Sequence, residues 1–166
     1  MLSYGLPREP STGRIGVWRK LKRLGVAQIG DGVVALPADA RTREQLEWIA
    51  QDITDAGGHV TVWLAQPTTA AAERELAACL AGARAAEYTQ VIATARAATS
   101  AAAPERAVVA RRLRAELRRI NRRDYFPPAE RDTARLAVHD LTDPMPDTST
   151  APGAEDRAAG VREPQP

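Results

Sequence analysis

The sequence predicts an α+β protein in which a small antiparallel sheet carries two helices and is followed by a helical extension. Within the first 66 residues, apolar side chains alternate in four short runs and recur every three or four residues in two longer stretches. The resulting order is β-α-β-β-α-β, and the next 75 or so residues contain only helical patterns. This order is typical of the ferredoxin-like split βαβ unit, with both helices on one face of a four-stranded sheet.

The first strand and helix are predicted from residues 2–25. Residues 2–6 alternate large and small side chains, and Pro7 ends that run. Ser11 or Thr12 is expected to cap the following helix, because a hydroxyl accepts well from a free N–H of the first turn. One broad side of this helix is apolar, and Gly25 supplies the left-handed conformation that ends it. The apolar side comprises Ile15, Val17, Trp18, Leu21 and Leu24.

A hairpin, a second helix and a fourth strand complete the unit. Residues 26–29 and 33–36 form β runs separated by Gly30-Asp31-Gly32, a sequence suited to a tight turn. Thr42 is expected to be the N-cap of the second helix, with Gln45 completing a capping box. The inward stripe of that helix is Leu46, Ile49, Ala50 and Ile53, whereas Trp48 points off the sheet, toward the helical segment or a partner. Residues 59–65 alternate again as the last strand.

The remaining chain divides into a helical extension and a tail. Residues 70–103 are rich in alanine and predict a long helix that covers the second face of the sheet. Pro104 suits the first turn of another helix, and residues 129–141 form a short last one. The predicted organisation is a sheet unit over residues 1–66, a helical extension packed on it over 67–141, and a disordered acidic tail over 142–166.

Charge is distributed in blocks that the formal net charge of +2 conceals. Residues 1–23 and 105–138 each carry a net charge of +5, whereas residues 24–104 and 139–166 each carry −4. Alternating blocks of this kind indicate an anionic partner. The single cysteine, Cys79, excludes an intramolecular disulfide, and its alanine-rich surroundings predict a buried position. With no signal peptide or membrane-spanning pattern in the sequence, we expect a cytoplasmic protein.

No catalytic chemistry is predicted. His59 and His139 have no ligands at metal-binding spacing, and no phosphate-binding or nucleophile motif occurs, so no metal or cofactor is expected. Small ferredoxin-like nucleases of the Cas2 kind carry an aspartate at the end of the first strand, where this chain has Ser3-Tyr4-Gly5. We therefore expect a binding protein rather than an enzyme.

Two sets of side chains are candidates for anion binding. A duplex DNA backbone suits the exposed cations of the two basic blocks, because phosphate contacts are made by Lys and Arg. That set is Arg19, Lys20, Lys22, Arg23, Arg111, Arg112, Arg118 and Arg119. A tetrahedral oxyanion suits the guanidinium groups and hydroxyls around the start of the first helix. That second set is Arg8, Ser11, Thr12 and Arg14.

Several segments together resemble the N-terminal domain of the chromate-resistance ChrB family. These are Pro7-Arg8-Glu9-Pro10-Ser11, residues 17–25, Gly32-Val33, residues 42–48, Gly57-Gly58 before a strand with Trp63, and Arg122-Arg123-Asp124-Tyr125-Phe126-Pro127. The resemblance implies a chromate-responsive regulator that binds DNA through this domain, with a Cas2/PaaX-like fold. Full-length members of the family carry a further C-terminal domain, which this sequence is expected to lack.

Two functions are compatible with these observations. The first is a DNA-binding transcriptional regulator of chromate resistance, expected to be a homodimer because symmetric DNA sites are read by symmetric proteins. The second is an oxyanion-binding or protein-interaction module in chromate resistance that does not contact DNA.

Overall fold

The computed structural model describes residues 1–9 and 11–142 and contains nine elements in the predicted order. The predicted disordered tail falls, from residue 143 onward, outside the described residues. The elements are β1 (Leu2–Gly5), α1 (Ser11–Leu24), β2 (Ala27–Gly30), β3 (Val33–Ala35), α2 (Ala40–Asp55), β4 (His59–Val62), α3 (Ala70–Ala97), α4 (Ala103–Asn121) and α5 (Glu130–Asp140).

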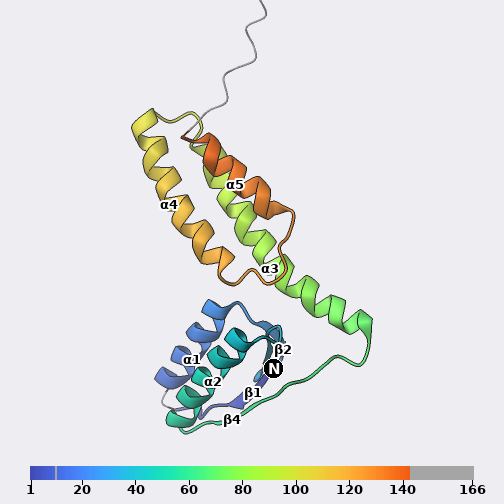
Figure 1. Cartoon of the computed structure of the whole chain (residues 1–166). Helices are drawn as coiled ribbons and strands as arrows, with labels where there is room; N and C mark the ends of the chain where they lie inside the picture. The colour runs from blue at the N-terminus through green and yellow to red at the C-terminus, as the bar shows by residue number, and fades with distance from the viewer. Residues whose placement is uncertain (10, 143–166) are drawn as a thin grey trace, which may run out of the picture.

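The four strands form one sheet in the order β2-β3-β1-β4, and every neighbouring pair is antiparallel. Leu2 of β1 stands opposite Val34 of β3 on one side and Val62 of β4 on the other. Since side chains alternate between the faces of a strand, these three residues share one face. The architecture is therefore α+β, with the sheet in the first part of the chain and a helical unit in the second (Figure 1).

Helices α1 and α2 cover the face of the sheet that carries Leu2. Val17 and Leu21 of α1 and Leu46 and Ile53 of α2 are buried against it in one apolar cluster. The stripe predicted for the second helix is confirmed. The α1 helix ends where predicted, with Gly25 at a φ of 70°.

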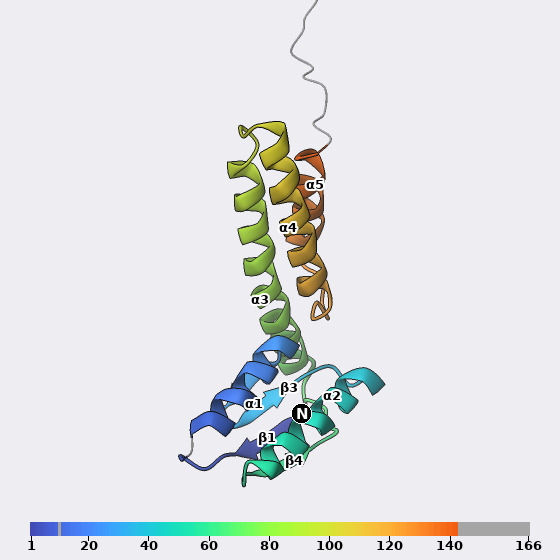
Figure 2. The same cartoon turned by 90° about the vertical axis from the view of Figure 1, so that its left-hand side faces the viewer.

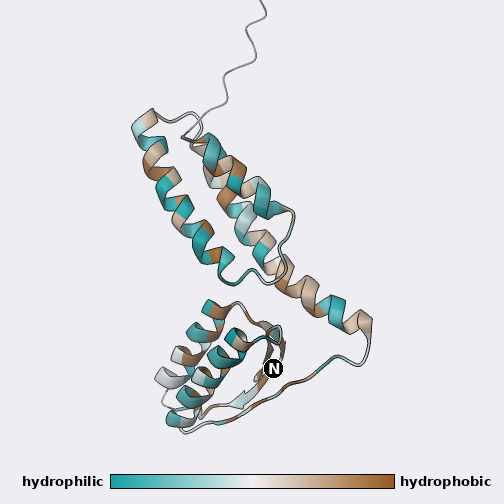
Figure 3. Cartoon of the chain, in the orientation of Figure 1, coloured by the Kyte–Doolittle hydropathy of each residue, from teal (hydrophilic) through white to brown (hydrophobic). Residues whose placement is uncertain are grey.

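Helices α3, α4 and α5 pack on one another around a second core, separate from the first (Figure 2). Tyr88 and Val91 of α3, Leu113 and Ile120 of α4, and Val138 of α5 are buried in this core. Hydrophobic and hydrophilic residues alternate along α4 and α5, as expected for helices that bury one side only (Figure 3). Pro104 lies in the first turn of α4, as predicted.

The N-terminal half of α3 extends past this three-helix core toward the second face of the sheet, where it contacts β2. A cleft of about 1370 Å³ separates α3 from the rest of that face, and Ile29, Trp63, Leu76 and Phe126 contribute to its walls. Cys79, on this projecting half, is exposed. Its predicted burial was wrong, because alanine content indicates a helix without indicating whether a neighbour covers it.

The start of α2 also differs from expectation. The N-cap is Asp39, whose carboxylate accepts from the Thr42 backbone N–H at 2.8 Å, while the Thr42 hydroxyl accepts from the Asp39 N–H at 3.3 Å. Thr42 therefore occupies position N3 of the capping box, and not the N-cap position that was predicted for it. Both Asp39 and Thr42 are suitable N-cap residues. The helix begins directly after Asp39 because aspartate is a strong N-cap.

Candidate nucleic-acid interface

The outer side of α1 presents three of its four predicted cations to solvent. Arg19, Lys22 and Arg23 are exposed on the side opposite the buried Val17 and Leu21. The Lys22 ammonium lies 5.0 Å from the centre of the Trp18 ring, a cation–π distance. Lys20 instead pairs with Asp52 of α2 and links the two helices. Among the described residues, none of the three exposed cations is in an ion pair with an acid.

The outer side of α4 carries a row of arginines along its length. Arg111, Arg114, Arg118 and Arg122 follow one another at intervals of three, four and four residues, which keeps them on one side of the helix. All four are exposed, and we refer to them as the α4 arginine row. Within residues 1–9 and 11–142, no acid lies at ion-pair distance from any member of the row.

The structure separates the other predicted arginines of α4 from this row. Arg112 lies by the groove between α3 and α4, and Arg119 pairs with Glu116 at 3.1 Å. The DNA-binding set predicted from the sequence includes Arg112 and Arg119 but not Arg114 or Arg122, which belong to the exposed row. The helical spacing of the row was present in the sequence and is the signal that identifies them.

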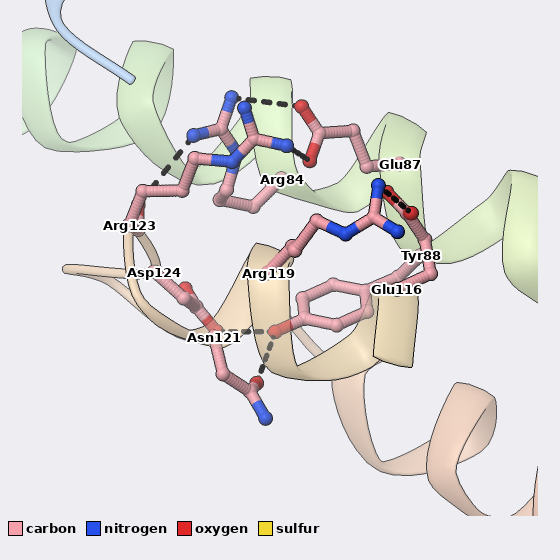
Figure 4. Close-up of polar contacts among 8 residues, drawn as sticks. All are labelled: Arg84, Glu87, Tyr88, Glu116, Arg119, Asn121, Arg123 and Asp124. Atoms are coloured by element: carbon pink, nitrogen blue, oxygen red, sulfur yellow. Dashed lines mark hydrogen bonds and ion pairs between the residues drawn. The ribbon is translucent and has the colours of Figure 1, made fainter. Parts of the chain in front are cut away.

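A buried polar network holds the end of α4 against α3 (Figure 4). The Tyr88 hydroxyl lies 2.7 Å from Asn121 Oδ1 and 2.8 Å from Asp124 Oδ2, and it donates its single proton to one of these oxygens at a time. Glu87 binds two guanidinium groups, that of Arg84 at 3.1 Å and that of Arg123 at 2.8 Å. The sequence does not predict this network, because residues 84–88 and 121–124 are far apart in the chain.

Burial shifts the pKa values of Tyr88 and Arg84 in this network. Desolvation, together with the Asp124 carboxylate, raises the pKa of Tyr88 well above its usual range, so the phenol remains a donor. Burial lowers the pKa of the Arg84 guanidinium, and Glu87 opposes that shift. An arginine nevertheless remains charged in proteins, so Arg84 contributes a fixed positive charge.

The ends of α1 and α4 meet at this network. The Tyr125 hydroxyl donates to the Leu24 carbonyl at 3.1 Å, and the Arg41 guanidinium donates to the Arg122 carbonyl at 2.6 Å. Gly25 lies so close to Arg84 that a side chain there would collide with the guanidinium. The two basic blocks, about 80 residues apart in sequence, are thereby joined end to end (Figures 1 and 2).

The predicted oxyanion set lies at the other end of α1. Ser11 and Thr12 are in the first turn of the helix rather than at its cap, since α1 begins at Ser11 and Pro10 lies outside the described residues. Arg8 and Arg14 are exposed nearby. A helix of 14 residues is about 21 Å long, so this set is well separated from the α4 arginine row.

Within residues 1–9 and 11–142, no group of three or more His, Cys, Asp or Glu side chains is placed to hold a metal ion. None of the helices described has the length and apolar character needed to cross a bilayer.

Comparison with known proteins gives one match. The model of the family described as "Protein ChrB, N-terminal" matches residues 14–150, which is most of the chain. The match begins inside α1 and includes every later element, whereas β1 and the first three residues of α1 precede it. Neither the curated proteins nor the solved structures contain a match. Because the family model matches well over half of the chain, the chain belongs to the family of ChrB N-terminal domains, a chromate-resistance family.

Proposed function

We propose that this protein is a DNA-binding transcriptional regulator of chromate resistance. The observation that carries the proposal is the end-to-end arrangement of α1 and α4. The exposed cations Arg19, Lys22 and Arg23 of α1, and the α4 arginine row, lack acidic partners among the described residues. Lys and Arg side chains that neutralise phosphates release counterions, and this release supplies most of the non-specific affinity for DNA. Membership of the ChrB family supports the link to chromate.

We further propose that the sheet unit is a ferredoxin-like split βαβ unit of the Cas2/PaaX-like kind, used for binding and not for catalysis. The strand order β2-β3-β1-β4 and the cover of one face by α1 and α2 support this assignment. The strand β1 ends in Ser3-Tyr4-Gly5 and offers no carboxylate for a catalytic metal.

The experiment is a gel-shift titration of the full chain on the duplex upstream of its own operon, at salt concentrations from about 50 to 200 mM. Replacing Arg118 and Arg122 of the row by alanine removes two predicted phosphate contacts. The slope of log affinity against log salt should then become shallower by about two. The variant R19A/R23A tests α1 in the same way.

The matched control is the variant R74A/R135A, which removes two exposed arginines from the projecting half of α3 and from α5. It should leave the slope unchanged. Absence of binding by the wild-type chain at about 50 mM salt, a condition that favours basic surfaces, contradicts the proposal.

A homodimer is the second part of this proposal. Trp48 is 69% exposed on the outer side of α2, so it does not pack on the helical segment and remains available to a partner. Light scattering of the full chain should give twice the mass of one chain, and W48A should shift the equilibrium toward monomer. A monomeric wild-type chain that still binds DNA would show that one copy suffices.

The oxyanion-binding module is the alternative. The exposed hydroxyls and guanidinium groups at the start of α1, where the first turn contains no acid, support it. Calorimetry with chromate, and with sulfate as a redox-inert control, should show binding that R14A abolishes. Each titration should be repeated in C79S, because chromate oxidises exposed thiols. A flat sulfate titration at millimolar concentration contradicts this alternative.

A further inference from the structure

We propose that the acidic segment 143–166 binds the α4 arginine row of its own chain and competes with DNA for it. This inference rests on the proposed function only in taking DNA as the ligand with which the segment competes. The contact itself is a property of the chain and is testable without DNA.

The last described residue already lies beside the row. The Arg114 guanidinium donates to the Thr142 hydroxyl at 2.7 Å. The Arg106 guanidinium donates to the carbonyl of the preceding residue, Leu141, at 3.2 Å. The end of α5 is thus fixed against α4, and the segment that follows starts next to one member of the row.

The charges of the segment and the row are complementary. Residues 143–166 contain five acids and two arginines, a net charge of −3. The row presents four guanidinium groups that lack acidic partners within the described part of the chain. Carboxylates bind guanidinium groups in the same forked geometry as phosphates do, so the segment offers the same type of contact as a DNA backbone. The five acids are Asp143, Asp147, Glu155, Asp156 and Glu163.

The segment is long enough to follow the row. Arg114 and Arg122 are eight residues apart on a helix, which is about 12 Å. An extended chain covers about 3.3 Å per residue, so the five residues from Thr142 to Asp147 suffice for that distance. Because the segment is tethered, its effective concentration at the row reaches about 1 mM, and weak contacts become populated.

The consequence is a DNA affinity lowered by the chain itself. Each ion pair between the segment and the row occupies an arginine that would otherwise contact phosphate. Exposed ion pairs weaken as salt increases, so this competition should be strongest at low ionic strength.

The contact is tested by paramagnetic relaxation in the full chain. The variant C79S/S149C carries one nitroxide in the segment, and replacing Cys79 is required because that thiol is exposed. At about 50 mM salt, amides of the row should lose intensity, and they should recover at about 0.5 M, where the Debye length is only about 4 Å and the attraction is strongly screened. Amides of α2 serve as the internal reference.

The variant D147N/E155Q/D156N/E163Q, which removes four of the five acids and carries the same label, separates attraction from simple tethering. The loss of intensity should disappear in it at every salt concentration. Equal loss in the charged and neutralised segments, or loss that salt does not change, would overturn the proposal.

Competition is tested by DNA affinity in unlabelled full chains. The neutralised variant should bind duplex about fivefold more tightly than wild type at low salt, which corresponds to a row occupied by the segment about four-fifths of the time. The matched control E44Q/D55N/E73Q/E75Q removes the same four charges from exposed positions on α2 and α3. Equal affinities of these two variants would overturn the competition. If none of the chains binds DNA, the regulator proposal fails, and the nitroxide experiment still decides the contact.

Discussion

The sheet unit and the helical unit both have an apolar core, and they differ in their buried polar groups. In the sheet unit, aliphatic side chains from α1, α2 and the strands fill the core, and none of the described residues of this unit is a buried charged residue. In the helical unit, charged and hydroxyl groups at one end add to the apolar core, among them Arg84, which is 6% exposed. Apolar packing tolerates adjustment, whereas a buried polar network is costly once one member is removed. The helical unit should therefore respond more sharply to single substitutions.

The largest effect is expected for D124A. The Asp124 side chain is only 2% exposed, is hydrogen-bonded by the Tyr88 hydroxyl and lies 4.0 Å from Arg131. Its removal takes away the carboxylate acceptor of the buried Tyr88 hydroxyl, which keeps only Asn121, and the acidic partner of Arg131. The expected cost is about 3 kcal/mol, because hydrogen bonds to charged groups are the stronger ones. Hydrogen exchange should show faster opening of α3, α4 and α5 and little change in α1 and α2. E75A, on an exposed part of α3, is the control, and equal acceleration in both units would contradict the comparison.

A smaller effect is expected for Y88F, which keeps the ring and removes only the hydroxyl. Asn121 and Asp124 then lose the single proton that the hydroxyl donates to one of them at a time, so the free energy of unfolding should fall by about 1–2 kcal/mol. Urea denaturation measures this change. A stability equal to wild type would mean that water replaces the hydroxyl and that the network is not the critical feature of this unit.

The pKa of Tyr88 should make the stability of the helical unit depend on pH. Burial and the Asp124 carboxylate raise the pKa of Tyr88 above the value of about 10 in an unfolded chain. The unfolded state therefore loses its phenol proton first as pH increases. The stabilisation is present below pH 10 and declines above it, by up to about 1.4 kcal/mol per pH unit for this group. Burial also raises the pKa values of Tyr4 and Tyr125, so Y88F should reduce this decline without abolishing it.

The connection between the units should be weaker than either unit. Y125F removes the hydrogen bond to the Leu24 carbonyl, a single neutral contact worth about 1 kcal/mol. Residual dipolar couplings should then fit each unit well but require separate alignment tensors. A single tensor for the whole chain in Y125F would show that Gly25 and the Arg41 contact suffice to fix the orientation.

The smallest effect is expected for the Lys20–Asp52 pair, which joins α1 to α2. Its side chains are 41% and 37% exposed, so solvent screens the attraction. A double-mutant cycle with K20A and D52A should give a coupling energy of at most about 0.5 kcal/mol. A coupling comparable to that of Tyr88 with Asp124 would remove the distinction between the two units.

The order of the elements followed from sequence because it depends on local patterns. Alternation and helical periodicity located the nine elements of the described residues, and Gly25 and Pro104 marked boundaries that the structure confirms. The cap of α2 was misplaced because Asp39 and Thr42 lie one turn apart and both are suitable cap residues. Family membership was also accessible from sequence, since the motifs around α1 and α2 and at 122–127 are distinctive in combination.

The positions of the basic residues relative to one another required the tertiary structure. Sequence showed two basic blocks but gave no means of pairing Glu87 with Arg123 or Leu24 with Tyr125, contacts that span 36 and 101 residues. It likewise predicted Cys79 to be buried, because helical periodicity cannot reveal that half of a helix lacks a neighbour. The chain by itself determined what each segment is. Only the folded structure decided which segments meet, because contacts between distant residues depend on the geometry of the whole and not on local preference.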